Sequence, residues 1–469
     1  MKKLLLCCIA LWQTAAFAQV FPVTNLKMSG RRDNRINLAI LPDGFTAAQQ
    51  PRFLLHADTI RRKAFEYTPL KEYSNFYNVF CIQVPSKDSG ANHPATATDV
   101  PETTPVIVVD NYFGSVFDNG GIHRALVVGK YATVASVLAS NLPDYDMVYV
   151  LSNTKMYGGT GGKFATGTIN AASVKVAVHE WGHSFAGLAD EYWAGTIFAS
   201  EKPNMTANNS PATVKWKNWL GYKATGIYPY DVSGPAASWY RPHQDCMMQY
   251  LDTVLCPVCK QTFIDEIYTL VTPIDAALPD TLVTRAVGST AMTFSVTLIK
   301  PIPNTFKIRW ELNGSPLTFT DTFALVSNSM LGVGSVNKLR VFVTDTTTLS
   351  RTYLPDAGYQ FSAGWNLTKS GTGISADPTG PGGKFAYKVY PVPASGSFSL
   401  AYDNQTNTRS LHFSLTDISG KVLREQTLAV GPGKGQLQQD ISGLPAGTYL
   451  VQLKGAEVLV STRISIVQE

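Results

Sequence analysis

The sequence lacks three features that would place it in familiar classes of protein. It has no strong excess of one charge, because 39 Lys and Arg residues stand against 34 Asp and Glu residues, and it has no basic cluster. So mild a surplus argues against nucleic acid as the main partner. After residue 18, no apolar run approaches the roughly eighteen residues that a membrane-spanning helix needs. Cysteine is scarce, with six in 469 residues. We therefore expect neither a nucleic-acid-binding protein nor a transmembrane one.

The first eighteen residues have the composition of a secretory signal peptide. A Lys-Lys pair at residues 2–3 precedes an apolar run at 4–12, and AFA at 16–18 forms an A-x-A cleavage site. Cleavage before Gln19 removes both lysines and two of the six cysteines, so the formal charge falls from +5 to +3. We therefore predict an exported protein.

Four cysteines remain after that cleavage: Cys81, Cys246, Cys256 and Cys259. In an oxidising compartment we expect disulfides, and four cysteines allow three pairings between which the sequence does not choose. The CPVC motif at 256–259 is also compatible with a redox pair or with half of a structural zinc site. A redox motif would open a helix in a small βαβ domain, and a four-cysteine zinc site would need a second CxxC pair. Disulfides are therefore the prediction, and one from Cys246 would brace the nearby Met248.

The segment at 19–272 alternates between strand and helix patterns. Thr46 followed by Gln49 resembles a capping box and predicts a helix that runs towards Tyr67. Alternating strands and helices imply crossover connections, and therefore an α/β fold with a mixed, mostly parallel sheet. Strands are expected at 34–42, 76–84 and 146–151, and further helices at 134–142 and 257–271.

After residue 272 the pattern changes to short alternating runs separated by turn residues. Such a period of two predicts an immunoglobulin-like β-sandwich at 273–372, with Trp310 in its core. A segment rich in Gly and Pro at 373–385 is predicted to be a linker, and a second β-sandwich is expected at 386–469. The clearest alternating runs lie at 292–299, 305–312 and 338–345.

The stretch HEWGHSFAGLADEY carries the most information about chemistry. His179 and His183 are four residues apart, so on a helix they project from one face. Imidazole is a preferred zinc ligand, and a catalytic zinc usually has three protein ligands and one open position. Glu180 lies beside the pair, where a carboxylate can take a proton from water. Gly187 favours a helix end, after which the chain can return a third ligand, which we predict to be Asp190. These ligands predict one zinc ion per chain.

The same stretch resembles the active-site motif of the IgA-peptidase family of zinc metallopeptidases, which is metzincin-like. The resemblance covers roughly residues 33–272 and implies a metzincin-like catalytic domain with Zn²⁺. Metzincins place the third ligand six residues after the second histidine. Asp190 lies seven residues after His183, so Glu191 and His243 stay open as alternatives.

The resemblance continues in RPHQDCMMQY, residues 241–250. Metzincins have a methionine-containing turn beneath the zinc, which implies this position for Met248. In astacin-like relatives a tyrosine two residues later can stabilise the oxyanion, which implies this role for Tyr250. The structural alternatives are core filling for the methionine and an ordinary half-buried tyrosine.

Four pieces near the C-terminus resemble the sorting domain of the type IX secretion system. This resemblance implies a small β-sandwich and export by the type IX machinery across the outer membrane of a Bacteroidetes-type bacterium. It also implies frequent removal of the domain and attachment to surface lipopolysaccharide. The protein is therefore expected to be secreted or attached to the cell surface. The pieces are VYPVPASGSFSL (389–400), LTDISGKVL (415–423), GLPAGTYLVQL (443–453) and STRISIV (461–467).

A glycine-rich stretch, YGGTGGK at 157–163, lacks the glycine spacing and the Ser or Thr of a phosphate-binding loop. We predict instead a flexible loop near the active-site cleft, where backbone can approach an extended substrate.

These patterns together predict a secreted zinc endopeptidase that acts on proteins or peptides. His179, His183 and Asp190 would hold the zinc, Glu180 would act as the general base, and Tyr250 would donate to the oxyanion. A surface adhesin or glycan-binding protein with a structural metal is one alternative, and a zinc amidase acting on glycan-linked peptides is another. A structural zinc normally has four protein ligands, and the motif offers three, which favours an enzyme. Nothing in the sequence specifies immunoglobulin A as the substrate.

Overall fold

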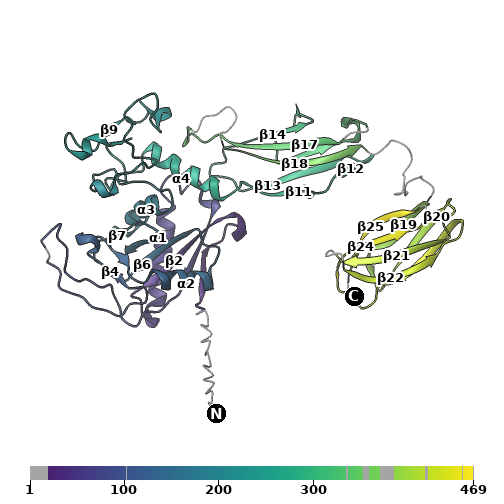
Figure 1. Cartoon of the computed structure of the whole chain (residues 1–469), viewed down its shortest axis with the longest axis horizontal. Helices are drawn as coiled ribbons and strands as arrows, with labels where there is room; N and C mark the ends of the chain where they lie inside the picture. The colour runs from purple at the N-terminus through teal and green to yellow at the C-terminus, as the bar shows by residue number, and fades with distance from the viewer. Residues whose placement is uncertain are drawn as a thin grey trace, which may run out of the picture. The chain divides into compact units, whose positions relative to one another are not determined.

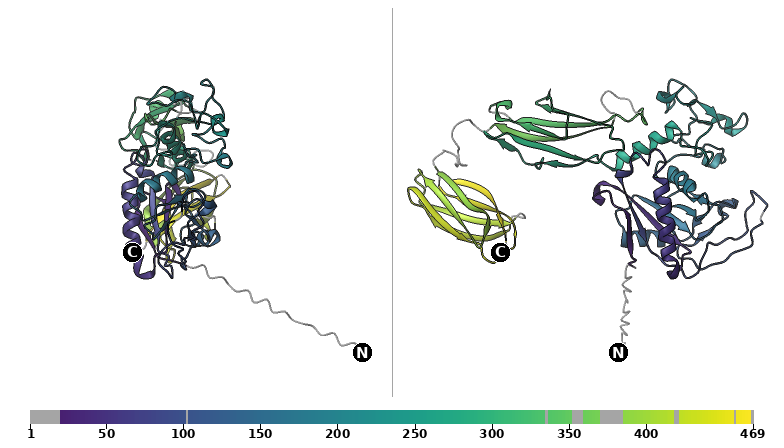
Figure 2. Two further views of the ribbon diagram at one scale, coloured as in Figure 1. Left: turned by 90° about the vertical axis from the view of Figure 1, so that its left-hand side faces the viewer. Right: turned by 180° about the vertical axis from the view of Figure 1, so that it is seen from behind.

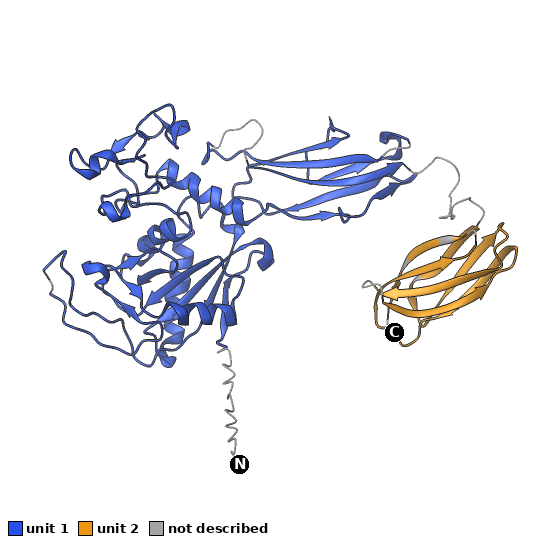
Figure 3. Ribbon diagram, in the orientation of Figure 1, with its two compact units in different colours: residues 1–369 blue, residues 370–469 orange. Residues whose placement is uncertain are grey.

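The computed structural model describes two compact units of the chain, residues 1–369 and 370–469 (Figure 3). The first unit contains the domain predicted at 19–272 and all but the last three residues of the domain predicted at 273–372. The predicted signal peptide and all but the last residue of the predicted linker lie outside the described residues. Those residues are 20–101, 103–333, 336–351, 359–369, 385–417, 421–456 and 458–467.

The first unit contains a six-stranded sheet with the strand order β1-β3-β2-β6-β8-β7 (Figure 1). The four central strands pair in parallel, whereas β1 and β7 add antiparallel edges. The predicted mixed, mostly parallel sheet is therefore confirmed. Its strands are β1 (Val23–Lys27), β2 (Ile36–Asp43), β3 (Tyr77–Ile82), β6 (Met147–Ser152), β7 (Gly159–Thr160) and β8 (Ala165–Thr168).

Helices cover both faces of this sheet, which explains why every residue of β2 is buried. Alternate side chains point to opposite faces. Ile36 and Leu38 join a core formed with α1, α3 and α4, whereas Ala39 and Leu41 join a core formed with α2. Helix α2 lies in front of the sheet in Figure 1, and α1 lies in front in the right-hand view of Figure 2. The helices are α1 (Gln50–Ala64), α2 (Tyr131–Asn141), α3 (Ser173–Ser184) and α4 (Pro257–Leu270).

The predicted elements of this region agree with the structure to within a few residues. The capping box is present, since the Thr46 backbone N–H donates to Gln49 Oε1 at 3.0 Å. It opens a short 3-10 turn that continues into α1. Strong local periodicity and capping chemistry therefore determined these elements.

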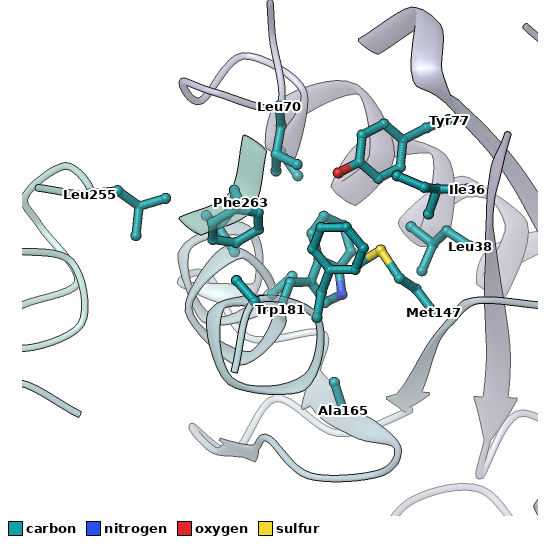
Figure 4. Close-up of a cluster of buried hydrophobic side chains, with 14 of the residues drawn as sticks. Ile36, Leu38, Leu70, Tyr77, Met147, Ala165, Trp181, Leu255 and Phe263 are labelled. Atoms are coloured by element: carbon teal, nitrogen blue, oxygen red, sulfur yellow. The ribbon is translucent and has the colours of Figure 1, made fainter. Parts of the chain in front are cut away.

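Trp181 anchors α3 in the core between the sheet and α4 (Figure 4). Its side chain is fully buried and meets the ring of Tyr149 edge-on, with centroids 5.9 Å apart. Residues two apart on a helix point to nearly opposite sides. The anchored tryptophan therefore turns His179 and His183 away from the sheet side of the helix.

Two long irregular regions precede and follow the segment that contains α3, at 85–130 and 185–256. They contain only short strands and 3-10 turns, so their backbone is available to build loops around the helix. The short strands are β4 (Ser115–Val116), β5 (Val127–Val128), β9 (Tyr228–Pro229) and β10 (Tyr240–Arg241). The 3-10 turns of the first unit lie at Arg32–Asn34, Ala47–Gln49, Ser74–Phe76, Asn119–Gly121, Thr196–Phe198, Lys217–Trp219, Pro235–Ser238 and Asn328–Met330.

The remainder of the first unit has two sheets, of three and five strands, that share one hydrophobic core. Trp310 is fully buried there and stacks on Trp365 with centroids 5.7 Å apart, which confirms its predicted place in a core. This part also contacts the helical part, because the hydroxyls of Tyr73 and Tyr268 both donate to Asp345 Oδ2. The strands are β11 (Ile274–Leu278), β12 (Arg285–Val287), β13 (Met292–Leu298), β14 (Phe306–Leu312), β15 (Ser315–Pro316), β16 (Phe323–Val326), β17 (Asn337–Asp345) and β18 (Gln360–Lys369).

The second unit is a seven-stranded arrangement in the order β22-β21-β24-β25-β19-β20-β23, around a core of its own. Among the described residues of both units, no helix combines the length and apolar character needed to cross a membrane. The strands are β19 (Phe385–Ser395), β20 (Ser397–Asn404), β21 (Ser410–Asp417), β22 (Val422–Ala429), β23 (Gly433–Asp440), β24 (Gly447–Lys454) and β25 (Leu459–Ile466).

Candidate metal centre and active site

The end of α3 is built by Gly187, as the sequence predicted. Gly187 has φ +63°, a left-handed conformation that glycine adopts without strain. Its N–H donates to the carbonyl of His183 at 3.2 Å, and the N–H of Leu188 donates to that of Gly182 at 2.9 Å. The chain therefore reverses at once and passes back beside the last turn of the helix.

This reversal and a second loop orient the two histidines of α3. The Nδ1 atom of His183 lies 2.8 Å from the carbonyl oxygen of Leu188, and that of His179 lies 3.0 Å from the carbonyl oxygen of Met247. A carbonyl can only accept a hydrogen bond, so both Nδ1 atoms carry the proton. In the neutral rings both Nε2 atoms are then bare acceptors, the form that a metal ligand requires.

Asp190 completes a triangle of acceptors with these two nitrogens. Its Oδ1 lies 3.2 Å from Nε2 of His179 and 3.3 Å from Nε2 of His183, and the two nitrogens are 3.1 Å apart. Asp190 Oδ1 is buried and has no hydrogen-bond partner. A tetrahedral zinc with bonds of about 2.0–2.1 Å separates its ligand atoms by roughly 3.3 Å. The three residues therefore fit a zinc ion.

The electrostatics of the triangle also require a positive charge. Burial opposes protonation of both imidazoles, but the contacts with Asp190 outweigh it and raise the pKa of His179 and, to about 9, that of His183. Burial likewise opposes ionisation of Asp190, yet the two imidazoles hold the pKa of its carboxyl well below the usual range. A divalent cation bound between the three side chains would supply this positive charge in place of protons on the imidazoles.

Glu180 supplies a buried carboxylate next to the histidine pair. Its oxygen and the ring nitrogens of His179 and His183 lie within 4.8 Å of one another. Burial raises the pKa of the Glu180 carboxyl, while both histidines act in the opposite direction. A carboxyl whose pKa is raised towards neutrality is suited to accept and return a proton.

The glycine-rich segment at 157–163 lies directly against α3, and it is irregular except at two residues. Gly159 and Thr160 form the edge strand β7. A Cβ at Gly159 would lie 2.7 Å from Val176 Cγ1 and 3.2 Å from Glu180 Oε1, and one at Gly161 would overlap His183 Cβ. Glycine is needed here because the strand packs so closely on the helix that bears the motif.

Met248 lies beneath α3, in the position implied by the resemblance to metzincins. Its side chain is fully buried, and its sulfur would be 2.7 Å from a Cβ at Gly182. Met247, one residue earlier, holds His179 through its carbonyl oxygen. The turn thus supports the helix by packing and by one hydrogen bond.

The other candidates for third ligand are placed elsewhere. Glu191 is fully buried and points to three cysteines, with its Oε1 3.1 Å from Cys259 Sγ. Both ring nitrogens of His243 are engaged by backbone, Nε2 with the carbonyl of Lys223 and Nδ1 with the N–H of Asp245, each at 2.9 Å. The structure therefore brings Asp190 to the histidine pair, whereas Glu191 and His243 make other contacts.

Tyr250 is 53% exposed, and among the described residues no hydrogen bond joins its hydroxyl to the histidine pair. Two side chains that the sequence did not single out interact with residues of the site, Tyr192 with Asp190 and Arg124 with Glu180. Tyr192 follows Asp190 by two residues, and burial together with the charge of Asp190 raises the pKa of its hydroxyl. Arg124 donates to that hydroxyl at 3.3 Å. Tyr192 ends the motif stretch and could have been suspected, whereas nothing in the sequence marks Arg124.

The disulfide prediction is wrong. All four cysteines are buried free thiols. Cys81 belongs to β3, in the sheet, whereas Cys246, Cys256 and Cys259 meet around Glu191. The expected oxidising compartment led to the prediction, but the fold gathers three of the cysteines and places the fourth elsewhere.

Two segments of the chain match established families. Residues 24–235 match IgA Peptidase M64. Residues 388–468 match the Secretion system C-terminal sorting domain. Both resemblances found in the sequence are therefore confirmed. The peptidase match supports a hydrolase of the peptidase class, and the sorting domain indicates export, contact with the secretion machinery and a secreted or surface location. The peptidase match stops before Met248 and the CPVC motif.

Three of the solved structures that match the chain have low sequence identity and low TM-scores. The three N-terminal domains of the bacteriophage RB49 Highly Immunogenic Outer Capsid protein are 13% identical, with 39% of this chain and 56% of that one covered and a TM-score of 0.16. The Clostridium thermocellum CbhA fibronectin(III)-like modules are 9% identical, with 41% and 93% covered and a TM-score of 0.17. The Parabacteroides merdae β-glucuronidase is 9% identical, with 50% and 28% covered and a TM-score of 0.19. No curated protein matches the chain.

Proposed function

We propose that the chain is a secreted zinc endopeptidase with a metzincin-like catalytic domain followed by two β-sandwich domains. One observation carries this proposal. Three potential ligand atoms, Nε2 of His179, Nε2 of His183 and Oδ1 of Asp190, converge beside the buried carboxylate of Glu180. The family match to a peptidase supports the same activity.

In this proposal His179, His183 and Asp190 hold Zn²⁺, which when bound supplies Lewis-acid polarisation of a water molecule and of the scissile carbonyl. Glu180 takes a proton from the attacking water and later delivers it to the leaving amine. The carbonyls of Met247 and Leu188 keep both imidazoles in the required tautomer.

Tyr192 and Arg124 are proposed as positioning residues. Tyr192 interacts with Asp190. Arg124 donates a hydrogen bond to the Tyr192 hydroxyl, and its guanidinium carbon lies 5.6 Å from the centroid of the Tyr192 ring. They would hold the Asp190 carboxylate in the orientation that meets the histidines. Tyr250 remains the predicted donor to the oxyanion, because an exposed tyrosine near the Met248 turn is free to move towards a bound substrate.

The proposed substrates are extracellular proteins or peptides, and the proposed source is a Bacteroidetes-type bacterium that attaches the protein to lipopolysaccharide after the sorting domain is removed. A library of unmodified peptides compared with glycan-linked peptides separates an endopeptidase from an amidase.

The decisive experiment replaces Glu180 by Gln in the full chain. The variant keeps the size of the side chain and loses the base, so peptide hydrolysis is expected to fall by at least about two orders of magnitude while zinc stays bound. A chelator should abolish the activity of the wild-type protein. Glu66→Gln is the matched control, because Glu66 is exposed at the end of α1 and pairs only with Lys63 among the described residues.

Hydrolysis at the wild-type rate by Glu180→Gln would exclude Glu180 as the base. An active preparation without any transition metal would overturn the metal mechanism. Bound zinc with no hydrolysis of any peptide in the wild-type protein would favour the adhesin.

A further inference from the structure

A second cluster of metal-ligating side chains lies outside the proposed catalytic site. Glu191, Cys246, Cys256 and Cys259 are all buried, and their ligand atoms lie within 4.8 Å of one another. They come from three places in the chain: the loop after α3, the turn that contains Met248, and the first turn of α4. Catalysis as proposed uses none of them.

The spacing of the cluster fits a tetrahedral zinc ion. Zinc–sulfur bonds of about 2.3 Å place two thiolates roughly 3.8 Å apart, and a zinc-bound carboxylate oxygen roughly 3.5 Å from each sulfur. Sγ of Cys246 and Sγ of Cys259 are 3.8 Å apart. Oε1 of Glu191 lies 3.1 Å from Sγ of Cys259 and 3.7 Å from Sγ of Cys256.

The buried carboxylate of Glu191 needs an explanation of its own, because neutral thiols would not compensate its charge. Glu191 is fully buried, and its Oε2 has no hydrogen-bond partner. A buried carboxylate is costly unless a cation or donors compensate it. Its Oε1 receives one strong donor, Asn204 Nδ2 at 3.1 Å, and otherwise faces sulfur. A metal ion would satisfy both the carboxylate and the three thiols.

A disulfide does not account for the cluster. Joining any two of the three sulfurs would leave the third thiol and the carboxylate buried together. The start of α4 instead favours anionic sulfur, since the N–H of Cys256 donates to Sγ of Cys246 at 3.2 Å at the positive end of the helix.

We propose that Glu191, Cys246, Cys256 and Cys259 bind a second, structural Zn²⁺. Four protein ligands close the coordination sphere, which is the arrangement of structural rather than catalytic zinc. Thiolate ligands select zinc over the hard cations Mg²⁺ and Ca²⁺. In an exported protein, metal coordination also protects thiols that would otherwise be oxidised.

The second site would brace the first through the backbone. Glu191 follows Asp190 directly, and its N–H donates to the carbonyl of Met248 at 2.7 Å. Cys246 lies one residue before Met247, whose carbonyl holds His179. A metal at the cluster therefore fixes both the segment that carries Asp190 and the turn beneath α3.

The test is the zinc content of the full chain purified from zinc-supplemented cells. The wild-type protein should contain two zinc ions per chain, and a His179→Ala, His183→Ala double variant should retain one. A Cys256→Ala, Cys259→Ala double variant should contain no more than one. Cys81→Ala is the matched control, because this buried cysteine lies in β3 outside the cluster, and it should retain two.

A measurement on the intact chain covers the case in which the cysteine variant does not fold. Cobalt(II) loaded into the wild-type protein and into the double histidine variant should give thiolate-to-cobalt charge-transfer absorption in both. Absence of this absorption in both proteins would overturn the proposal, as would a wild-type mass lower by two hydrogen atoms, which marks a disulfide. If only the proposed catalytic function is wrong, the outcome is distinguishable, because the histidine variant would still show the charge-transfer absorption and still contain one zinc ion.

Discussion

Replacing Gly182 by Ala tests whether the turn beneath α3 supports the metal site by direct packing. A Cβ at this position would lie 2.7 Å from Met248 Sδ, 3.1 Å from Met248 Cε and 3.4 Å from Leu188 Cδ1. Favourable contacts between such atoms lie at about 3.5–4.0 Å, so Met248 would have to retreat by roughly 0.8 Å. Its side chain is fully buried, so any such movement takes place within the hydrophobic core.

The expected cost follows from two opposing effects. Overpacking a well-packed core costs about 1–3 kcal/mol, whereas Ala in place of Gly within a helix contributes up to about 1 kcal/mol of stability. We therefore expect Gly182→Ala to lower the free energy of unfolding of the first unit by up to about 2 kcal/mol. In a Met248→Ala background the overlap is absent, so the same change should be neutral or stabilising.

Denaturant unfolding at fixed zinc concentration, followed by tryptophan fluorescence, measures these free energies. All eight tryptophans lie before residue 370, so the signal reports on the first unit and not on the second. The four proteins of the cycle isolate the interaction of residues 182 and 248. If Gly182→Ala has the same effect with and without Met248, the packing argument is refuted.

Two further predictions concern single carboxylates. Asp190→Asn keeps the shape of the side chain but removes its charge, so the dissociation constant of the catalytic zinc should rise more than tenfold. A competition assay with a chromophoric chelator measures this constant. An unchanged constant would show that Asp190 is not a zinc ligand. Asp275 accepts hydrogen bonds from the buried Arg35 at 2.8 and 3.0 Å, and Asp275→Asn should destabilise the first unit by about 1–3 kcal/mol at neutral pH. The hydrogen bond with Arg35 is the largest of the effects that lower the pKa of the Asp275 carboxyl in the folded protein. The stability that ionised Asp275 contributes is therefore fully present above its unfolded-state pKa and is lost as pH falls through the lower folded-state pKa. The difference between variant and wild type should therefore shrink in strong acid, and a constant difference would contradict the assignment.

The sequence by itself determined the features that depend on local spacing. His179 and His183 are four positions apart on a helix, so the two share a face. Gly187 ends the reversal after the helix because glycine adopts the left-handed conformation without strain. Three of the four parallel strands, β2, β3 and β6, were predictable because they are largely apolar runs between turn residues, whereas β8 was not predicted. The two family resemblances rest on equally local motifs.

Only the tertiary structure decided which side chains meet across long stretches of chain. Asp190 and Glu191 are adjacent and chemically alike, yet the hydrogen bond from the Glu191 N–H to Met248 turns one towards the histidines and the other towards the cysteines. Arg124 reaches Tyr192 from a loop 68 residues earlier, and no periodicity records that contact. The cysteines form no disulfide for the same reason. The path of the irregular region from Gly187 to α4 decides which sulfur atoms approach one another, and this path depends on packing against α3.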